Sequence, residues 1–313
     1  METYTQAPGG GKGSTLFEPV GIKANEAEKI RRKSQTYLQD ASRRFRQNKA
    51  AMLGIILILF FVLMSFLGPV LCGYNYNAVD MKAANQSPSA LHWFGTDELG
   101  RDMWARVWTG GRTSINIGVI AALLQGTLGI IVGSIAGFVG GKVDNFIMRI
   151  VEFMTAFPYL VWVTLLMMVT GSGILPMILA LTLTGWLSMA RLVRGQILSL
   201  KNEDYVLAAV SLGSGAKRII YKHMIPNMMG VIIVNMTFAI PGAIFSEAFL
   251  SFIGIGIASP QTSWGLLVSM GMKQIYNYPL RLLIPCICIS LTMLSLQLIG
   301  DGLRDALDPK LRR

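Results

Sequence analysis

The segment DYVLAAVSLGSGAKRIIYKHMIPN (Asp204–Asn227) decides how this chain is interpreted, because it is polar, basic and punctuated by glycine between two long apolar stretches. Two adjacent alanines, Ala208 and Ala209, are followed by Gly213 and then by Pro226, where the next apolar stretch begins. A plain connection between membrane spans needs no such internal order. The pattern predicts a docking element on the inner face of a membrane protein, with an ordinary basic loop as the alternative.

The same segment predicts two short helices separated by a turn. The first covers Asp204–Leu212, and Gly213 and Gly215 end it because glycine accepts the positive φ that often follows a helix. The second, Ala216–Met224, is expected to lie along the membrane plane. Its basic residues should face water or a partner and its apolar residues the bundle; they are Lys217, Arg218 and Lys222 on one side and Ile219, Ile220 and Met224 on the other. Proline then suits the first turn of the following span.

The composition of the whole chain indicates a polytopic membrane protein. Of its 313 residues, 52% are apolar and only 14% are charged, whereas soluble domains carry about 25% charged residues. The mean hydropathy is +0.51. The first apolar run begins near residue 50, too late for a signal peptide, so we expect it to remain as a membrane anchor.

Six apolar stretches are long enough to cross a bilayer as helices. They lie at about Ala50–Leu71, Ile115–Val139, Ile147–Val169, Ile174–Val193, Met228–Phe252 and Leu282–Gly300. Basic residues concentrate in alternate connections and at both ends, which places both termini in the cytoplasm. The same distribution explains the net charge of +11 without nucleic-acid binding. The predicted fold class is therefore an all-α polytopic membrane protein with six transmembrane helices.

The predicted spans divide the chain into four parts. These are a cytoplasmic tail (1–49), the first span with an extracytoplasmic loop (50–110), a core (111–302) that contains the inner loop 201–227, and a cytoplasmic tail (303–313). Residues 1–23 are expected to be disordered. Residues 24–48 predict either a basic amphipathic helix in the headgroup layer, with Ile30, Tyr37, Leu38 and Phe45 on one face, or a solvated charged tail.

The second predicted span carries a face of small residues, Gly126, Gly129, Gly133 and Gly137. Because lipid provides no hydrophobic drive between helices, they associate through close contact of small side chains. The face therefore predicts a tightly packed bundle, with a sliding or pore-lining surface as the alternative.

No catalytic or metal site is predicted. Cys72 has no obvious partner, and Cys286 and Cys288 face different directions on a helix because they are two residues apart. His92 and His223 are isolated on opposite sides of the predicted membrane.

The segment Asp204–Asn227 resembles the EAA motif of permease subunits from binding-protein-dependent ABC importers. That motif runs Glu-Ala-Ala, three residues, Gly, nine residues, Ile-x-Leu-Pro, and five residues here fall in register: Ala208, Ala209, Gly213, Ile225 and Pro226. Leu207 replaces the glutamate and His223 replaces the first isoleucine. Glu203 and Asp204 supply acidic side chains one turn earlier.

Other stretches resemble the oligopeptide, dipeptide and nickel class of these permeases, and two of them its oligopeptide C subunits in particular. They are HWFGTDELGRDMWARVWTGGRTSINIG (His92–Gly118), SEAFLSFIGIG (Ser246–Gly256) and SWG (Ser263–Gly265) for the class, and MARLVRGQILSLK (Met189–Lys201) and GDGLRDALDP (Gly300–Pro309) for the C subunits. The likeness covers roughly residues 40–310.

The resemblance implies a type I ABC importer permease, which would translocate oligopeptides across a bacterial plasma membrane by alternating access. Its implied partners are a second related permease, two cytoplasmic ATPases that bind ATP and Mg, an external peptide-binding protein and membrane lipid. The chain itself would hold no cofactor and be no enzyme, since it lacks a G-x-x-x-x-G-K-[ST] phosphate loop. The implied ATPase-coupling residues are Glu203, Asp204, Ala208, Ala209, Gly213, Lys217, Arg218, Ile225 and Pro226.

Two further sets of residues are candidates for contact with the substrate or with the external protein. Glu247 lies alone inside the fifth span after Pro241, and an acidic residue within the membrane is a functional candidate. Glu247 and Pro241 are therefore assigned to the translocation path. The alternative is that Glu247 has a structural role and pairs with a neighbouring group. An outer charged cluster is assigned to docking of the binding protein, with a salt-bridged rigid loop as the alternative; it consists of Asp97, Glu98, Arg101 and Asp102.

Other functions would require different sequence features. Dipeptide or nickel import is the nearest alternative. A secondary transporter would show internal repeats and broken helices with midplane charges, and a membrane-embedded enzyme would show converging polar residues at the depth of the spans.

Overall fold

Helices form nearly all the regular structure of residues 37–308, the part of the chain that the computed structural model describes, and no strand occurs within it. They are α2 (Tyr37–Gln47), α3 (Lys49–Cys72), the 3-10 helix η2 (Met81–Ala83), α4 (Met103–Val139), α5 (Gly141–Ala156), α6 (Tyr159–Thr170), α7 (Ile174–Leu200), α8 (Asp204–Ser211), α9 (Ala216–Ile219), the π-helical turn η3 (Ile220–Met224), α10 (Ile225–Phe252), α11 (Trp264–Lys273) and α12 (Leu280–Leu307). The all-α prediction is confirmed. The predicted tail helix at 24–48 is seen only as α2, because its first part lies outside the described residues.

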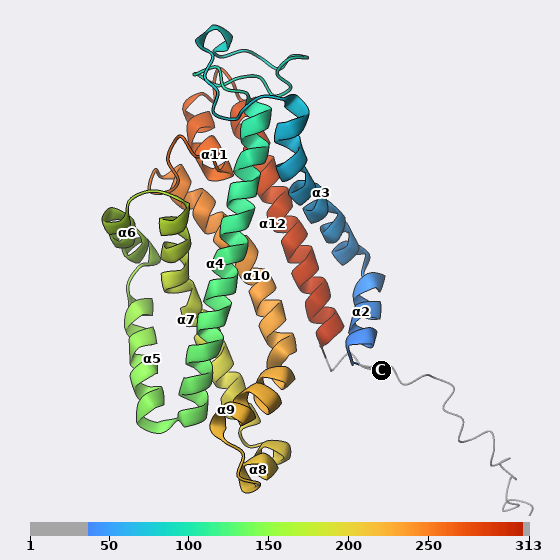
Figure 1. Cartoon of the computed structure of the whole chain (residues 1–313), viewed down its shortest axis with the longest axis vertical. Helices are drawn as coiled ribbons and strands as arrows, with labels where there is room; N and C mark the ends of the chain where they lie inside the picture. Colours follow the sequence, from blue (N-terminus) through green and yellow to red (C-terminus); the bar gives the residue numbers. More distant parts are fainter. Residues whose placement is uncertain (1–36, 309–313) are drawn as a thin grey trace, which may run out of the picture.

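The long helices run along the long axis of the molecule, with α4 in the middle of the bundle (Figure 1). The segments α8 and α9 lie at one end of the bundle, on the same side as the turn between α4 and α5 (Figure 1). The loop between α3 and α4 lies at the opposite end together with α11. We call these the α8 end and the α11 end.

Within residues 37–308, five helical stretches are long and apolar enough to cross a membrane. They are α3, α4, α7, the continuous stretch Ala216–Phe252 and α12. The helices α5 and α6 count as a sixth span only if they are taken together, because they are bent by 89°. The predicted span at about Ile147–Val169 is therefore present only as a bent pair of helices. The break falls at Phe157, which is extended because the following Pro158 disfavours helical geometry in the residue before it.

Three of the four glycines on the small-residue face of α4 pack against α7, and the fourth, Gly126, faces Met236 of α10. A Cβ placed on Gly129 would lie 2.5 Å from the Cβ of Met189, and one on Gly133 would lie 2.5 Å from the carbonyl oxygen of Ala190. Gly137 meets Ile197 in the same way. The absence of side chains thus allows the two helices to approach closely, and the prediction of a tightly packed bundle is confirmed.

Two helices differ from the sequence-based expectation at the α11 end. The helix α4 begins at Met103, well before the expected Ile115, because Asp102 caps it and its carboxylate accepts a hydrogen bond from the Ala105 amide at 2.8 Å. The helix α11 lies in a connection where none was predicted. Ser263 caps it through a hydrogen bond from the Leu266 amide at 3.2 Å.

Candidate functional site

The turn between α8 and α9 is built around Gly213. This residue has φ +75°, its N–H donates to the Val210 carbonyl at 2.9 Å, and the Ser214 N–H donates to the Ala209 carbonyl at 3.0 Å. Those two bonds form a Schellman motif, which ends a helix with a left-handed residue. The predicted glycine turn is confirmed at Gly213. Gly215 has an ordinary φ of −67° and precedes α9, so it was wrongly assigned a role in ending α8.

The two short helices are anchored to the bundle by their apolar side chains. Val206 and Ala209 of α8, with Ile219 of α9 and Met224 of η3, are buried in one cluster with residues of α7 and α10. The expected inward direction of Ile219 and Met224 is confirmed. Ala209 is buried rather than open to a partner, and only Ala208 of the pair is exposed. The turn is therefore packed directly against two candidate spans, α7 and α10.

The second predicted helix, Ala216–Met224, is not separate from the span that follows it, and its orientation along the membrane plane stays a prediction. Residues Ala216–Phe252 form one continuous helical stretch in which η3 joins α9 to α10. Ile225 and Pro226 are consequently the first residues of α10, as the proline was expected to be. The turn thus continues directly into a candidate span.

An apolar surface projects from the tip of this turn. Leu212 is 86% exposed and Tyr221 is 62% exposed. We call the exposed apolar residues of this region the α8 surface; they are Leu207, Ala208, Val210, Leu212 and Tyr221. Around it lie exposed charged residues, namely Glu203, Asp204, Lys217, Arg218 and Lys222. An apolar patch with a polar rim is typical of a protein-binding site.

The phenol of Tyr205 stays neutral near this surface. Burial raises its pKa, and the nearby Glu203 carboxylate raises it further because it disfavours a second negative charge.

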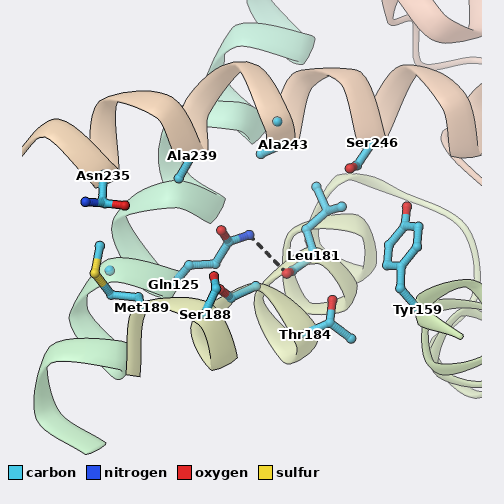
Figure 2. A pocket seen from close by; sticks show the side chains of 13 residues that line it. Gln125, Tyr159, Leu181, Thr184, Ser188, Met189, Asn235, Ala239, Ala243 and Ser246 are labelled. Atoms are coloured by element: carbon cyan, nitrogen blue, oxygen red, sulfur yellow. Dashed lines mark hydrogen bonds between the residues drawn. The ribbon is translucent and has the colours of Figure 1, made fainter. Parts of the chain in front are cut away.

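A half-open cavity of about 310 Å³, lined by both apolar and uncharged polar residues, lies between α4, α6, α7 and α10. Figure 2 shows its side chains converging from these four helices. Its lining consists of Gln125, Gly126, Tyr159, Leu181, Thr184, Gly185, Ser188, Met189, Asn235, Ala239, Gly242, Ala243 and Ser246. None of these residues is charged. Hydroxyls and carboxamides provide all its polar side chains, so the cavity can offer hydrogen bonds but no net charge.

The cavity was not predicted from the sequence, although the sequence carries one signal for it. Gln125, Ser188 and Asn235 are polar residues inside three different apolar stretches. Polar side chains within spans tend to face the interior of a bundle or a water-filled cavity. Attention to these neutral residues, as well as to the acid, would have indicated an internal polar site.

Glu247 does not line the cavity. Its side chain is fully buried and accepts hydrogen bonds from Ser114 at 2.7 Å and from Ser251 at 2.9 Å. Ser114 in turn accepts the Trp264 amide at 3.2 Å, which links α4, α10 and α11. Pro241 is also buried and outside the lining. The assignment of both to the translocation path stays a prediction, and this geometry favours the structural alternative for Glu247.

The outer charged cluster is largely internal. Asp97 Oδ2 accepts hydrogen bonds from Arg101 Nε at 2.7 Å and from Arg106 Nη1 at 2.8 Å, and all three side chains are buried. Asp102, also buried, contacts His92 Nδ1 at 2.8 Å.

Of the four residues predicted at this cluster, Glu98 alone is exposed, and it accepts a hydrogen bond from Gln274 at 2.8 Å. The geometry favours the rigid-loop alternative, and docking of an external protein here stays a prediction. Arg106 was not among the residues predicted for this network. Arg106 lies nine residues after Asp97, and this separation does not by itself predict a contact between the two side chains.

No group of three or more His, Cys, Asp or Glu side chains is placed to hold a metal ion within residues 37–308.

A bundle of candidate membrane spans with a pocket lined only by uncharged residues between them points to the membrane-spanning component of a transporter. Comparison with known proteins makes this specific. The chain belongs to the family of binding-protein-dependent transport system inner membrane components, whose model matches residues 129–313. The model for the N-terminal TM domain of oligopeptide transport permease C matches residues 36–88.

Individual relatives agree with the family. The chain is 49% identical to the oligopeptide transport system permease protein OppC of Bacillus subtilis (strain 168), over 95% of this chain and 98% of that protein. It is also 49% identical to the dipeptide transport system permease protein DppC of the same organism, over 93% and 91%. With OppC of Escherichia coli (strain K12) it shares 40% identity over 91% and 95%.

A solved structure supports the fold. The inward-facing MetNI methionine ABC transporter aligns with a TM-score of 0.54 over 64% of this chain and 95% of that chain, at 16% identity. The resemblance of the sequence to ABC importer permeases is thereby confirmed, and the protein is a multi-pass membrane component of a bacterial transport system.

Proposed function

We propose that this chain is the permease subunit of an ATP-driven importer that moves oligopeptides across the plasma membrane by alternating access. The α8 surface carries this proposal, because its glycine turn falls in register with the EAA motif and presents apolar side chains to a partner. The match of residues 36–88 to oligopeptide transport permease C supports an oligopeptide substrate.

In this proposal the α8 surface seats in a groove on a cytoplasmic ATPase. Leu207 occupies the position where the motif has glutamate, so the contact here depends on apolar shape with Leu212 and Tyr221 rather than on that charge. Glu203, Asp204, Lys217 and Arg218 form its polar rim. Closure of the ATPases would displace α8, and the buried Val206 and Ile219 would pass that displacement to α7 and α10.

The complete importer in this proposal contains a second related permease, two ATPases and an external peptide-binding protein. The ATPases hold ATP and Mg and perform hydrolysis, so this chain contributes no catalytic residue. The α8 end and both termini are cytoplasmic, because the basic segments flank them. The α11 end then faces the binding protein.

Reconstitution of the complete transporter into proteoliposomes tests this function. We expect peptide uptake only when the two ATPases, ATP and the peptide-loaded binding protein are all present. A matched preparation with hydrolysis-deficient ATPases should show no uptake. Uptake that persists without the ATPases would identify a secondary transporter and contradict the proposal.

Dipeptide import is a second, less supported candidate, because the dipeptide permease of B. subtilis is also 49% identical to this chain but over 93% of it, against 95% for the oligopeptide permease. Competition distinguishes them. Unlabelled pentaalanine should reduce uptake of a labelled tripeptide if the substrate is an oligopeptide, whereas competition by dialanine alone would indicate a dipeptide importer.

A further inference from the structure

We propose that the cavity between α4, α6, α7 and α10 is an uncharged site that hydrogen-bonds to the main chain of the transported peptide. The Gln125 carboxamide is its fixed hydrogen-bonding group. This inference rests on the proposed function and adds how the substrate is recognised. The cavity volume of about 310 Å³ lies near the lower end of the range of ligand pockets.

The Gln125 side chain is held in one position. It is buried, and its Nε2 donates a hydrogen bond to the Leu181 carbonyl on α7 at 3.0 Å (Figure 2). The carboxamide also fills the space beside Gly185. A Cβ on that glycine would lie 2.1 Å from Gln125 Cδ and 2.4 Å from Nε2. Gly185 therefore provides the room that lets the carboxamide lie against α7.

The bond to Leu181 leaves part of the carboxamide available. A glutamine side chain has two N–H donors and one carbonyl acceptor, and only one donor is engaged with a group of residues 37–308. The remaining donor and acceptor match the C=O and N–H of a peptide unit. The fixed position matters because a preorganised group loses little conformational entropy when it binds.

The rest of the lining extends the same chemistry. Ser188 and Thr184 of α7, Asn235 of α10 and Tyr159 of α6 surround the cavity, and all are uncharged (Figure 2). A fixed charge here would favour peptides of opposite charge and hinder those of like charge. Hydroxyls and carboxamides instead bind the main chain that all peptides share, so the site accepts peptides whatever their side-chain charges.

The test places a charge in the cavity of the complete reconstituted transporter. Uptake of Ala-Lys-Ala and Ala-Glu-Ala is measured for the wild type, Gln125→Glu and Asn235→Asp, with the binding protein loaded to the same level. We expect each variant to raise the ratio of Lys to Glu peptide uptake about tenfold over the wild type, since charges interact strongly in a partly dehydrated cavity. If Gln125→Glu assembles poorly, Asn235→Asp still gives an independent measurement of the ratio of Lys-peptide to Glu-peptide uptake.

A pair of glycine variants on α7 tests the fixed position of the carboxamide. Gly185→Ala should displace Gln125 and lower uptake of both peptides about tenfold without changing their ratio. Gly195→Ala is the matched control, because nothing lies within 4 Å of a Cβ there, and its uptake should equal that of the wild type.

Unchanged ratios in both charge variants, or normal uptake by Gly185→Ala, would overturn this inference. The proposed function would still stand in that case, because the wild type would continue to transport peptide with ATP. Absence of ATP-dependent peptide uptake in the wild type would instead overturn both.

Discussion

Replacement of Gly213 by alanine should uncouple the subunit without preventing its insertion. The residue has φ +75°, and no atom lies within 4 Å of a Cβ placed on it. The cost of the substitution is therefore conformational rather than steric, about 1–2 kcal/mol for an L-residue in the left-handed region. A penalty of that size changes the ratio of intact to unwound turn by about 5- to 30-fold.

The turn has few contacts with which to resist that strain. The helix α8 has eight residues, of which Val206 and Ala209 are buried, so unwinding of its last turn is the expected response. We expect peptide-stimulated ATPase activity of the reconstituted transporter to fall severalfold, with an unchanged amount of subunit in the membrane. Gly213→Asn should retain more activity than Gly213→Ala, because asparagine tolerates positive φ better.

Gly215→Ala is the matched control for this experiment. Gly215 lies two residues further on, its φ is −67° and its Cβ position is equally open, so alanine there should leave coupling intact. Normal ATPase stimulation in Gly213→Ala, or an equal loss in Gly215→Ala, would show that positive φ at this turn is not what coupling requires.

Further expectations concern packing and buried polar groups. Gly133→Ala should lower the melting temperature in detergent by several degrees, because its Cβ would lie 2.5 Å from a carbonyl of α7 and overpacking costs about 1–3 kcal/mol; Gly195→Ala should not. Glu247→Ala should destabilise the protein by about 1–3 kcal/mol by removing the acceptor of two buried hydroxyls. Glu247→Gln should leave the uptake ratio of charged to neutral peptides unchanged, and a changed ratio would place this residue in the path. Arg194→Lys should increase proteolysis at the α4–α5 turn, since lysine cannot keep both 2.5 Å hydrogen bonds to Asp144 of α5. The loss of folding stability should be about 1 kcal/mol or less, because the Arg194 side chain is one-third exposed.

Features determined by local chemistry could be predicted from the sequence. Long apolar runs predicted the positions of most candidate spans. Gly213 was predicted as the turn residue because a left-handed position after a helix strongly favours glycine. The small residues of α4 indicated close packing because their three- and four-residue spacing puts them on one side of a helix. Each of these inferences needed no knowledge of a distant partner.

Features that depend on distant partners could not be predicted in this way. Gln125 is fixed by a glycine and a carbonyl on α7, and that pairing depends on the register of α4 against α7, which the sequence of either helix leaves undetermined. Glu247 was visible as a lone acid, but its hydroxyl partner Ser114 is on another helix. The bend at Pro158 was hidden for a different reason, because apolar residues continue on both sides of the break.

The hydrogen bonds around Glu247 also bear on how the protein is made. An acidic side chain such as Asp at the centre of an inserting helix costs about 2.5–3.5 kcal/mol, and α10 carries Glu247 within a long apolar stretch. The ribosome completes α4, with Ser114, before it begins α10, so the group that receives the carboxylate is already in the bilayer. The order of the helices along the chain therefore allows the Ser114 hydroxyl to donate to this carboxylate as soon as α10 packs against α4.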